Sequence, residues 1–173
     1  MKKRYTIIGI IFCIAAGTLL HFAYEWSGEN TAVGIFSAVN EGIWEHLKLL
    51  FYPVLIFSVF EYFAYAKSIS AFVPARLIGT LLGMFFIVAA FYTYSGIIGK
   101  NYGVVNIIIF VLSVFITFIY TAIAVKTKPK SAAVCTTISV LVVVLFIILF
   151  TAFTFNPPHI NLFADPVNGT YGM

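Results

Sequence analysis

The chain has 173 residues, of which 62% are hydrophobic, 18% are aromatic and only 9% are charged. Soluble domains carry about 25% charged residues, so this composition excludes an ordinary soluble protein. The formal net charge of +4 does not indicate nucleic-acid binding, because the basic residues lie between apolar runs, where they orient membrane spans. No polar block is long enough to fold separately. We therefore expect a single membrane domain over residues 1–173, with the lipid bilayer as its partner.

Five apolar runs are each long enough to cross a hydrocarbon core about 30 Å thick as an α-helix. They cover residues 5–26, 47–66, 76–98, 104–125 and 132–153, each to within a few positions. Lipid leaves open backbone unsatisfied, and the alternating pattern of barrel strands is missing, so helices are expected. The sequence predicts an all-α polytopic transmembrane helix bundle with five spans and one amphipathic interfacial helix.

The first span ends with two groups that can carry chemistry. His21 and Glu25 are four residues apart, so they share a face of the helix. Together they can present two ligands, or an acid and a base, to one cavity. The alternative is that His21 simply caps the helix terminus.

Residues 33–50 show a different pattern, with apolar and polar residues on separate faces at helical spacing. The apolar residues are Val39, Ile43, Leu47 and Leu50, and the polar residues are Ser37, Glu41, Glu45 and Lys48. This pattern predicts an amphipathic helix at the membrane interface that runs into the second span. The alternative is that these residues form the solvated end of a long second helix.

Glu41 and Glu45 repeat the four-residue spacing on this predicted helix. His46 follows Glu45 directly and points in another direction on an ideal helix. If both serve one site, that site lies between helices, or one of the two only orients the other. The alternative is that Glu41 and Glu45 form a solvated face paired with Lys48.

The third span contains Gly79 and Gly83, a pair of small residues at the spacing that permits close helix packing. We expect another helix to approach closely at this point.

The basic residues predict the orientation, because those in short loops favour the cytoplasm. Eight of the ten fall on one side of the predicted topology: Lys2, Lys3, Arg4, Lys67, Arg76, Lys126, Lys128 and Lys130. We therefore expect a multi-pass protein of the cell membrane with its N-terminus in the cytoplasm and its C-terminus outside. All three histidines and five of the six acids then lie near the outer ends of the helices.

The tail, residues 154–173, carries prolines, an Asn-Gly turn signal and aromatic residues. It is too apolar for a simple disordered extension, and we expect it to fold back over the outer ends of the helices. His159 and Asp165 would then lie close to the other acids and histidines. The alternative is that His159 is an ordinary loop residue.

Two stretches carry a resemblance to a known family: NEGIWEHLKLLFYP at residues 40–53 and PPHINLFADPVNGTYG at residues 157–172. With them, the chain resembles an uncharacterised family of small bacterial multi-pass membrane proteins that share an Asn-Glu-x-x-Trp-Glu-His-x-Lys core and a Pro-Pro-His tail. The resemblance implies no activity, but it supports grouping the motif residues. Gly42 stands where the pattern leads us to expect a small hydroxyl residue such as Ser.

Imidazole and carboxylate ligands together suit zinc or another divalent metal, although the chain has no HExxH motif, no HxxxH motif and no pair of Cys ligands. The predicted metal ligands are His21, Glu41, Glu45 and His159. The predicted catalytic residues are Glu41 and Glu45. The predicted further ligands, or residues that orient the ligands, are Glu25, Asn40, Trp44, His46, Lys48 and Asp165.

These residues favour a metal-dependent hydrolase or transferase that acts on a lipid or another substrate near the membrane. One alternative is a proton-linked or small-solute transporter, which needs ionisable groups near the middle of the bilayer. Another is a non-catalytic membrane scaffold or assembly factor, which needs no cluster at all. These three classes can be distinguished by whether the predicted residues meet around one cavity.

Overall fold

The computed structural model of the chain describes residues 2–127, 129 and 131–173. Lys128 and Lys130, which contributed to the predicted orientation, lie outside these ranges. The elements are α1 (Lys3–Trp26), α2 (Thr31–Gly34), α3 (Ile43–Ala64), the 3-10 helix η1 (Ala66–Ser68), α4 (Phe72–Ile98), α5 (Gly103–Ala124) and α6 (Ala132–Phe155). All but α2 and η1 are long and apolar enough to cross a membrane. The predicted all-α fold with five spans is confirmed for the described part of the chain, where the β pairing consists of an isolated bridge between Ala164 and Tyr171.

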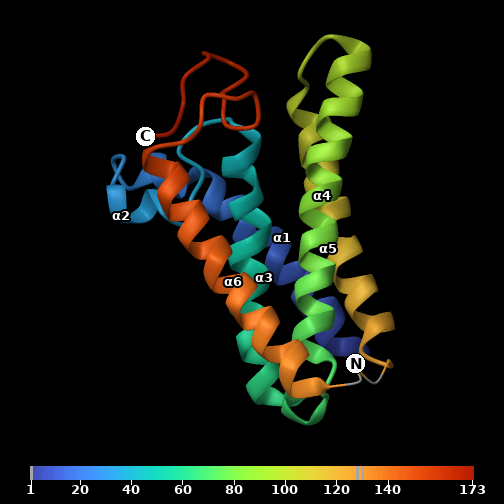
Figure 1. Cartoon of the computed structure of the whole chain (residues 1–173). Helices are drawn as coiled ribbons and strands as arrows, with labels where there is room; N and C mark the ends of the chain where they lie inside the picture. Colours follow the sequence, from blue (N-terminus) through green and yellow to red (C-terminus); the bar gives the residue numbers. More distant parts are fainter. Residues whose placement is uncertain (1, 128, 130) are drawn as a thin grey trace.

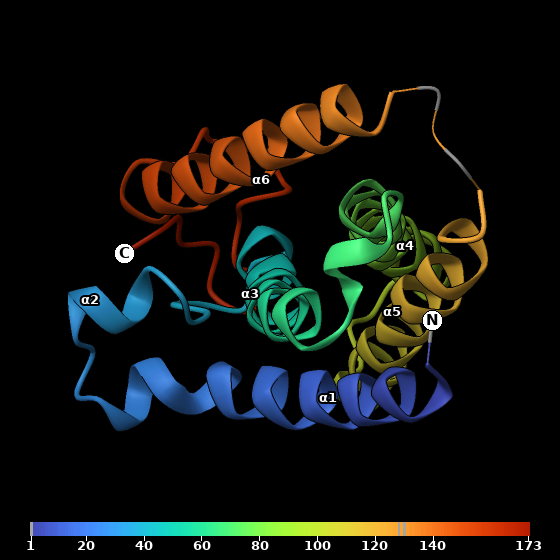
Figure 2. The same cartoon turned by 90° about the horizontal axis from the view of Figure 1, so that it is seen from below.

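The spans surround α3. Seen along the bundle, α3 lies between α1 and α6, and α4 and α5 stand together beside it (Figure 2). The N-terminus lies at one end of the bundle, and the tail after α6 lies at the other end together with α2 (Figure 1). The most buried of the five spans is α3, and the least buried is α6. Apolar side chains of α3 such as Leu50, Val54 and Phe57 therefore form the centre of the core.

The C-terminal end of α3, which the predicted orientation places at the cytoplasmic side, holds a fully buried carboxylate. Glu61 accepts hydrogen bonds from Arg76 of α4 and, at 2.7 Å, from the hydroxyl of Tyr65. A carboxylate within a membrane span is a functional hypothesis by default. Because this one is paired with a cation of the next span, it ties α3 to α4.

The structure differs from the prediction of one interfacial helix over residues 33–50. Helix α2 ends at Gly34, residues 35–42 are not helical, and α3 begins at Ile43. The carbonyl oxygens of Gly34 and Ser37 accept hydrogen bonds from the buried Lys48 ammonium instead of continuing a helix. The Asn40 side chain accepts a hydrogen bond from the Gly42 N–H at 2.8 Å, which closes a turn directly before α3. Glu41 therefore lies in a loop.

Helices α4 and α5 pack closely at the two glycines of the third span. A Cβ added to Gly79 would lie 2.6 Å from the Thr117 carbonyl oxygen, and one added to Gly83 would lie 2.8 Å from the Ser113 carbonyl oxygen. Real Cβ atoms do not approach backbone this closely, so neither position has room for a side chain. The close helix approach predicted from the glycine spacing is confirmed.

Replacing Gly83 should therefore destabilise the bundle. Gly83→Leu forces α4 and α5 apart, and overpacking of this kind costs about 1–3 kcal/mol. Gly96 of the same helix is the matched control, because a Cβ there would meet no atom within 4 Å. We expect Gly83→Leu to lower the melting temperature in detergent and Gly96→Leu to leave it unchanged. Equal melting temperatures for the two variants would contradict the packing.

The orientation of the bundle remains a prediction from its basic residues. Reporter fusions after Lys67 should report the cytoplasm, whereas fusions after Lys100 and Met173 should report the outside. Each fusion point lies at an end of the bundle, so it leaves the preceding spans complete. A cytoplasmic signal from the Met173 fusion would reverse the orientation.

Candidate metal centre

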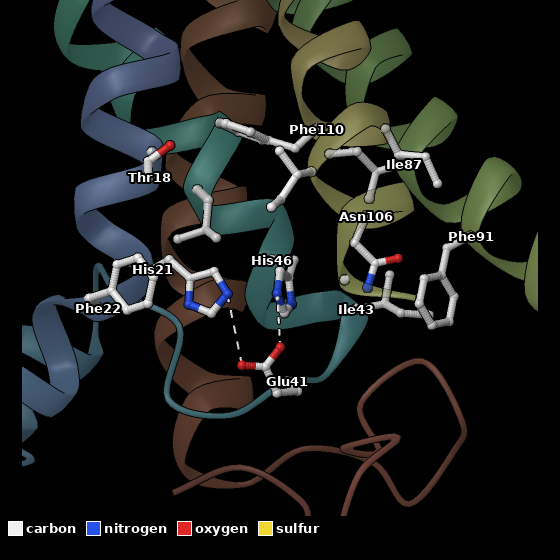
Figure 3. Close-up of a pocket in the computed structure, with 15 residues that line it drawn as sticks. Thr18, His21, Phe22, Glu41, Ile43, His46, Ile87, Phe91, Asn106 and Phe110 are labelled. Carbon is white, nitrogen blue, oxygen red and sulfur yellow. Dashed lines mark ion pairs between the residues drawn. The ribbon is translucent and has the colours of Figure 1, made fainter. Parts of the chain in front are cut away.

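Three side chains from different elements meet at one end of the bundle. His21 lies near the end of α1, Glu41 in the loop before α3, and His46 in the first turn of α3. One ligand atom from each lies within 4.8 Å of the other two. The carboxylate of Glu41 faces both imidazoles (Figure 3): one oxygen is 3.8 Å from His21 Nε2 and the other is 3.5 Å from His46 Nε2.

These separations are close to those of a metal site. Zinc–ligand bonds of about 2.1 Å in a tetrahedron place neighbouring donor atoms roughly 3.4 Å apart. The carboxylate oxygens already lie near this distance from the two histidine nitrogens. Small rotations of the three side chains would bring the donor atoms around one ion.

His46 is held in the orientation of a metal-ligating histidine. Its Nδ1 lies 2.9 Å from the carbonyl oxygen of Gly42, which can only accept a hydrogen bond, so Nδ1 carries the hydrogen. In the neutral ring the lone pair is then on Nε2, the atom that faces Glu41. Most metal-ligating histidines donate their other ring N–H in this way to a backbone carbonyl, a carboxylate or water. Two acceptors, the Nε2 lone pair and the carboxylate, thus face one another and require a proton or a metal ion between them.

The loop that carries Glu41 is fixed by the tail. Asp165, which is 4% exposed, accepts a hydrogen bond from the Glu41 N–H at 3.3 Å and another from the Val167 N–H. Asn40 donates to the Gly172 carbonyl oxygen at 3.1 Å. Asn40 and Asp165 therefore contact the backbone of the loop and the tail, and they act on the centre by positioning Glu41.

The tail also explains Gly42. A Cβ at this position would lie 2.8 Å from the Asn40 side-chain oxygen and 3.2 Å from the Phe163 carbonyl oxygen. A serine, which the resemblance leads us to expect here, would push against both. Glycine lets the tail approach the start of α3.

A cavity of about 250 Å³ extends from the three side chains into the bundle. Its walls come from α1, α3, α4 and α5 and are mostly apolar; they include Ile43, Leu49, Ile87, Phe91 and Phe110. Asn106 adds a further polar group, whose side chain is hydrogen-bonded to Tyr94 and Asn101. Asn106 was not among the predicted site residues, although an amide within a span is itself a signal.

The charges of the centre favour an ionised Glu41. When His46 is protonated on Nε2 as well, it donates a hydrogen bond to Glu41 and holds the pKa of that carboxyl below its usual value of 4.5, against the opposing effect of partial burial. Glu41 is therefore a carboxylate, and a possible ligand, at neutral pH.

The remaining predicted site residues lie elsewhere. Glu45 is buried, and its carboxylate pairs with the Lys48 ammonium at 2.5 Å. His159 is exposed and stacks on the ring of Tyr171, with ring centroids 4.5 Å apart. Glu25 is exposed near the end of α1. Of the four predicted ligands, the structure brings together His21 and Glu41, and it adds His46, which was predicted as a further ligand or orienting residue.

Trp44 belongs to the core. Its ring packs against Phe150, Phe153 and Phe163, with centroid separations of 4.9, 5.6 and 5.1 Å. It joins α3 to α6 and the tail, and lies outside the group of His21, Glu41 and His46.

The fold and this group define a multi-pass membrane protein with a histidine and carboxylate cluster at one end of its helix bundle. The chain belongs to the family of unknown function DUF6512, whose family model matches residues 1–173. The match agrees with the resemblance to an uncharacterised family. No curated protein and no solved structure matches the chain.

The lowered pKa of Glu41 gives a test of the pair in metal-free protein. Because the folded pKa lies below 4.5, the ionised carboxylate stabilises the fold fully above that pH, and the contribution is lost as the pH falls through the folded pKa. With a chelator present, the wild type should melt above Glu41→Gln at pH 5.5, and the difference should shrink towards pH 3.

Glu25→Gln is the control, since Glu25 is exposed and outside the group. It should melt as the wild type does at both pH values. The interaction between ionised Glu41 and His46 would be contradicted if the melting temperatures of the wild type and Glu41→Gln differ by the same amount at pH 5.5 and pH 3.

Proposed function

We propose that His21, Glu41 and His46 bind a divalent transition metal, zinc for preference, and that the protein is a metal-dependent hydrolase or transferase with a substrate at the membrane. The observation that carries the proposal is the meeting of three ligand atoms within 4.8 Å at the polar end of an apolar cavity.

The donor set is that of a catalytic site. Two imidazoles and one carboxylate leave one position of a tetrahedral zinc ion for water, whereas structural sites fill all four with protein ligands. A metal bound there supplies a Lewis acid and lowers the pKa of its water. In hydrolysis of an ester, the water oxygen bonds to the acyl carbon, the carbon–oxygen bond to the alcohol breaks, and the alcohol leaves with a proton. In transfer, an acceptor hydroxyl takes the place of water.

The surroundings favour a substrate from the membrane. The cavity beside the group lies between four spans, and its walls are mostly apolar. The group itself lies at the ends of α1 and α3, where a polar headgroup would stand. Transport would instead call for ionisable groups near the middle of the spans, facing a path. With the N-terminus in the cytoplasm, the proposed site faces outwards.

Glu45 and His159 are left out of the proposed ligand set for physical reasons. The Glu45 carboxylate neutralises a buried ammonium, and removing it would leave that charge uncompensated. His159 stacks on Tyr171 in the tail. The proposed set therefore keeps Glu41 as the one carboxylate ligand.

Metal analysis tests the proposal directly. Protein purified in detergent without a histidine tag, loaded with zinc and dialysed, should retain about one zinc ion per chain by elemental analysis. Loss of a ligand removes one of three protein bonds, so His21→Ala and His46→Ala should each bind zinc at least tenfold more weakly. Even the residues that merely orient ligands affect affinity by about 10–100-fold.

His159→Ala is the matched control, because it removes the third histidine of the chain from outside the group. It should retain zinc as the wild type does. Two results would contradict the proposed ligands. In one, the wild type and all three variants retain the same amount of zinc; in the other, His159→Ala loses zinc as His46→Ala does.

A further inference from the structure

The cavity next to the proposed metal site has two chemically different ends. His21, Glu41 and His46 lie at one end (Figure 3). Away from them the lining is aliphatic or aromatic, apart from Asn106 and Thr18. The Asn106 amide is hydrogen-bonded to Tyr94 and Asn101, and the Thr18 hydroxyl donates to the Ile14 carbonyl oxygen at 2.8 Å. A ligand that fills the cavity therefore meets polar groups at its head and hydrocarbon along its length.

Apart from Glu41, the exposed part of the lining comes from two spans. Phe22 of α1 is 42% exposed and Ile107 of α5 is 64% exposed, and both are apolar. Thr18 of α1 and Gly103 of α5 are the other exposed members on these helices. Since α1 and α5 are long and apolar enough to cross a membrane, we expect lipid beside this edge. A hydrocarbon chain can then enter the cavity sideways without crossing water.

The volume limits what can enter. At about 30 Å³ for a water-sized group, the cavity of about 250 Å³ holds roughly eight such groups. A methylene is of similar size, so the space suits one aliphatic chain of about eight carbons. Two chains side by side do not fit.

We propose that this cavity binds one aliphatic chain of an amphiphile and presents the oxygen-bearing head, such as an ester, to His21, Glu41 and His46. The role of the head rests on the proposed function, whereas the binding of the chain rests on the cavity alone. The cavity therefore takes one aliphatic chain, and a second chain on the same head would stay in the bilayer.

Gly103 offers a way to fill the cavity without disturbing the fold. It lines the cavity, and a Cβ there would meet no atom within 4 Å. Gly103→Leu should therefore fold and occupy the space that the chain would take. Gly96→Leu is the matched control, because its Cβ also meets no atom within 4 Å but Gly96 lies outside the cavity lining. Thr18→Phe fills the cavity independently from α1.

The experiment measures binding of 1-octanoylglycerol to the zinc-loaded protein in detergent by native mass spectrometry, with the zinc content of each sample determined in parallel. We expect the wild type and Gly96→Leu to bind it equally, and Gly103→Leu and Thr18→Phe to bind it at least tenfold more weakly. All four should retain the same zinc content.

One result would overturn the chain site: binding of 1-octanoylglycerol by Gly103→Leu and Thr18→Phe that equals the binding by the wild type. A different result would overturn the metal proposal alone. In that case the wild type retains no zinc, yet 1-octanoylglycerol still binds and Gly103→Leu still abolishes the binding. That outcome supports the cavity as a chain site.

Discussion

The buried ammonium of Lys48 constrains the whole end of the molecule that carries the cluster. Its Nζ is 2.5 Å from the Glu45 carboxylate, 2.6 Å from the Thr154 hydroxyl, 3.0 Å from the Gly34 carbonyl oxygen and 3.2 Å from that of Ser37. An unpaired charge here would cost about 3–5 kcal/mol, so α2, the following loop, α3 and α6 must all keep their places around it. The loop then runs over the start of α3 and delivers Glu41 between His21 and His46.

Much of the fold follows from the sequence because the bilayer leaves few choices. Each apolar run that is long enough to cross must be helical to satisfy its backbone, and all five predicted spans are present as helices. The close approach of another helix at Gly79 and Gly83 was also predicted, since only small residues permit it, but the sequence did not predict that this helix is α5. The segment before α3 was predicted wrongly. Its apolar residues recur at helical spacing, but tertiary hydrogen bonds hold its backbone in another conformation. The Lys48 ammonium donates hydrogen bonds to the carbonyl oxygens of Gly34 and Ser37, and the Asn40 turn stops any helix before Ile43.

The candidate site was predicted only in part. The errors again come from the segment before α3, which is not helical. The four-residue spacing of Glu41 and Glu45 places them on one face only if both are helical, but Glu41 lies in the loop. Freed from the helix, Glu41 reaches His46, while Glu45 contacts Lys48. Single-sequence spacing cannot foresee this separation, because it depends on Thr154 and Asp165 from the far end of the chain. The adjacency of Glu45 and His46 indicated that they point in different directions on a helix, but it did not indicate which of the two meets His21 and Glu41.

The proposed site holds a metal ion with two histidines and one carboxylate at the polar end of an apolar cavity. X-ray absorption at the zinc edge of the loaded protein in detergent tests this most directly. We predict nitrogen and oxygen donors at about 2.0–2.2 Å, with the outer-shell scattering of two imidazole rings, and the scattering of one ring in His46→Ala. A shell of oxygen donors without imidazole scattering, or a spectrum unchanged by His46→Ala, would contradict the account.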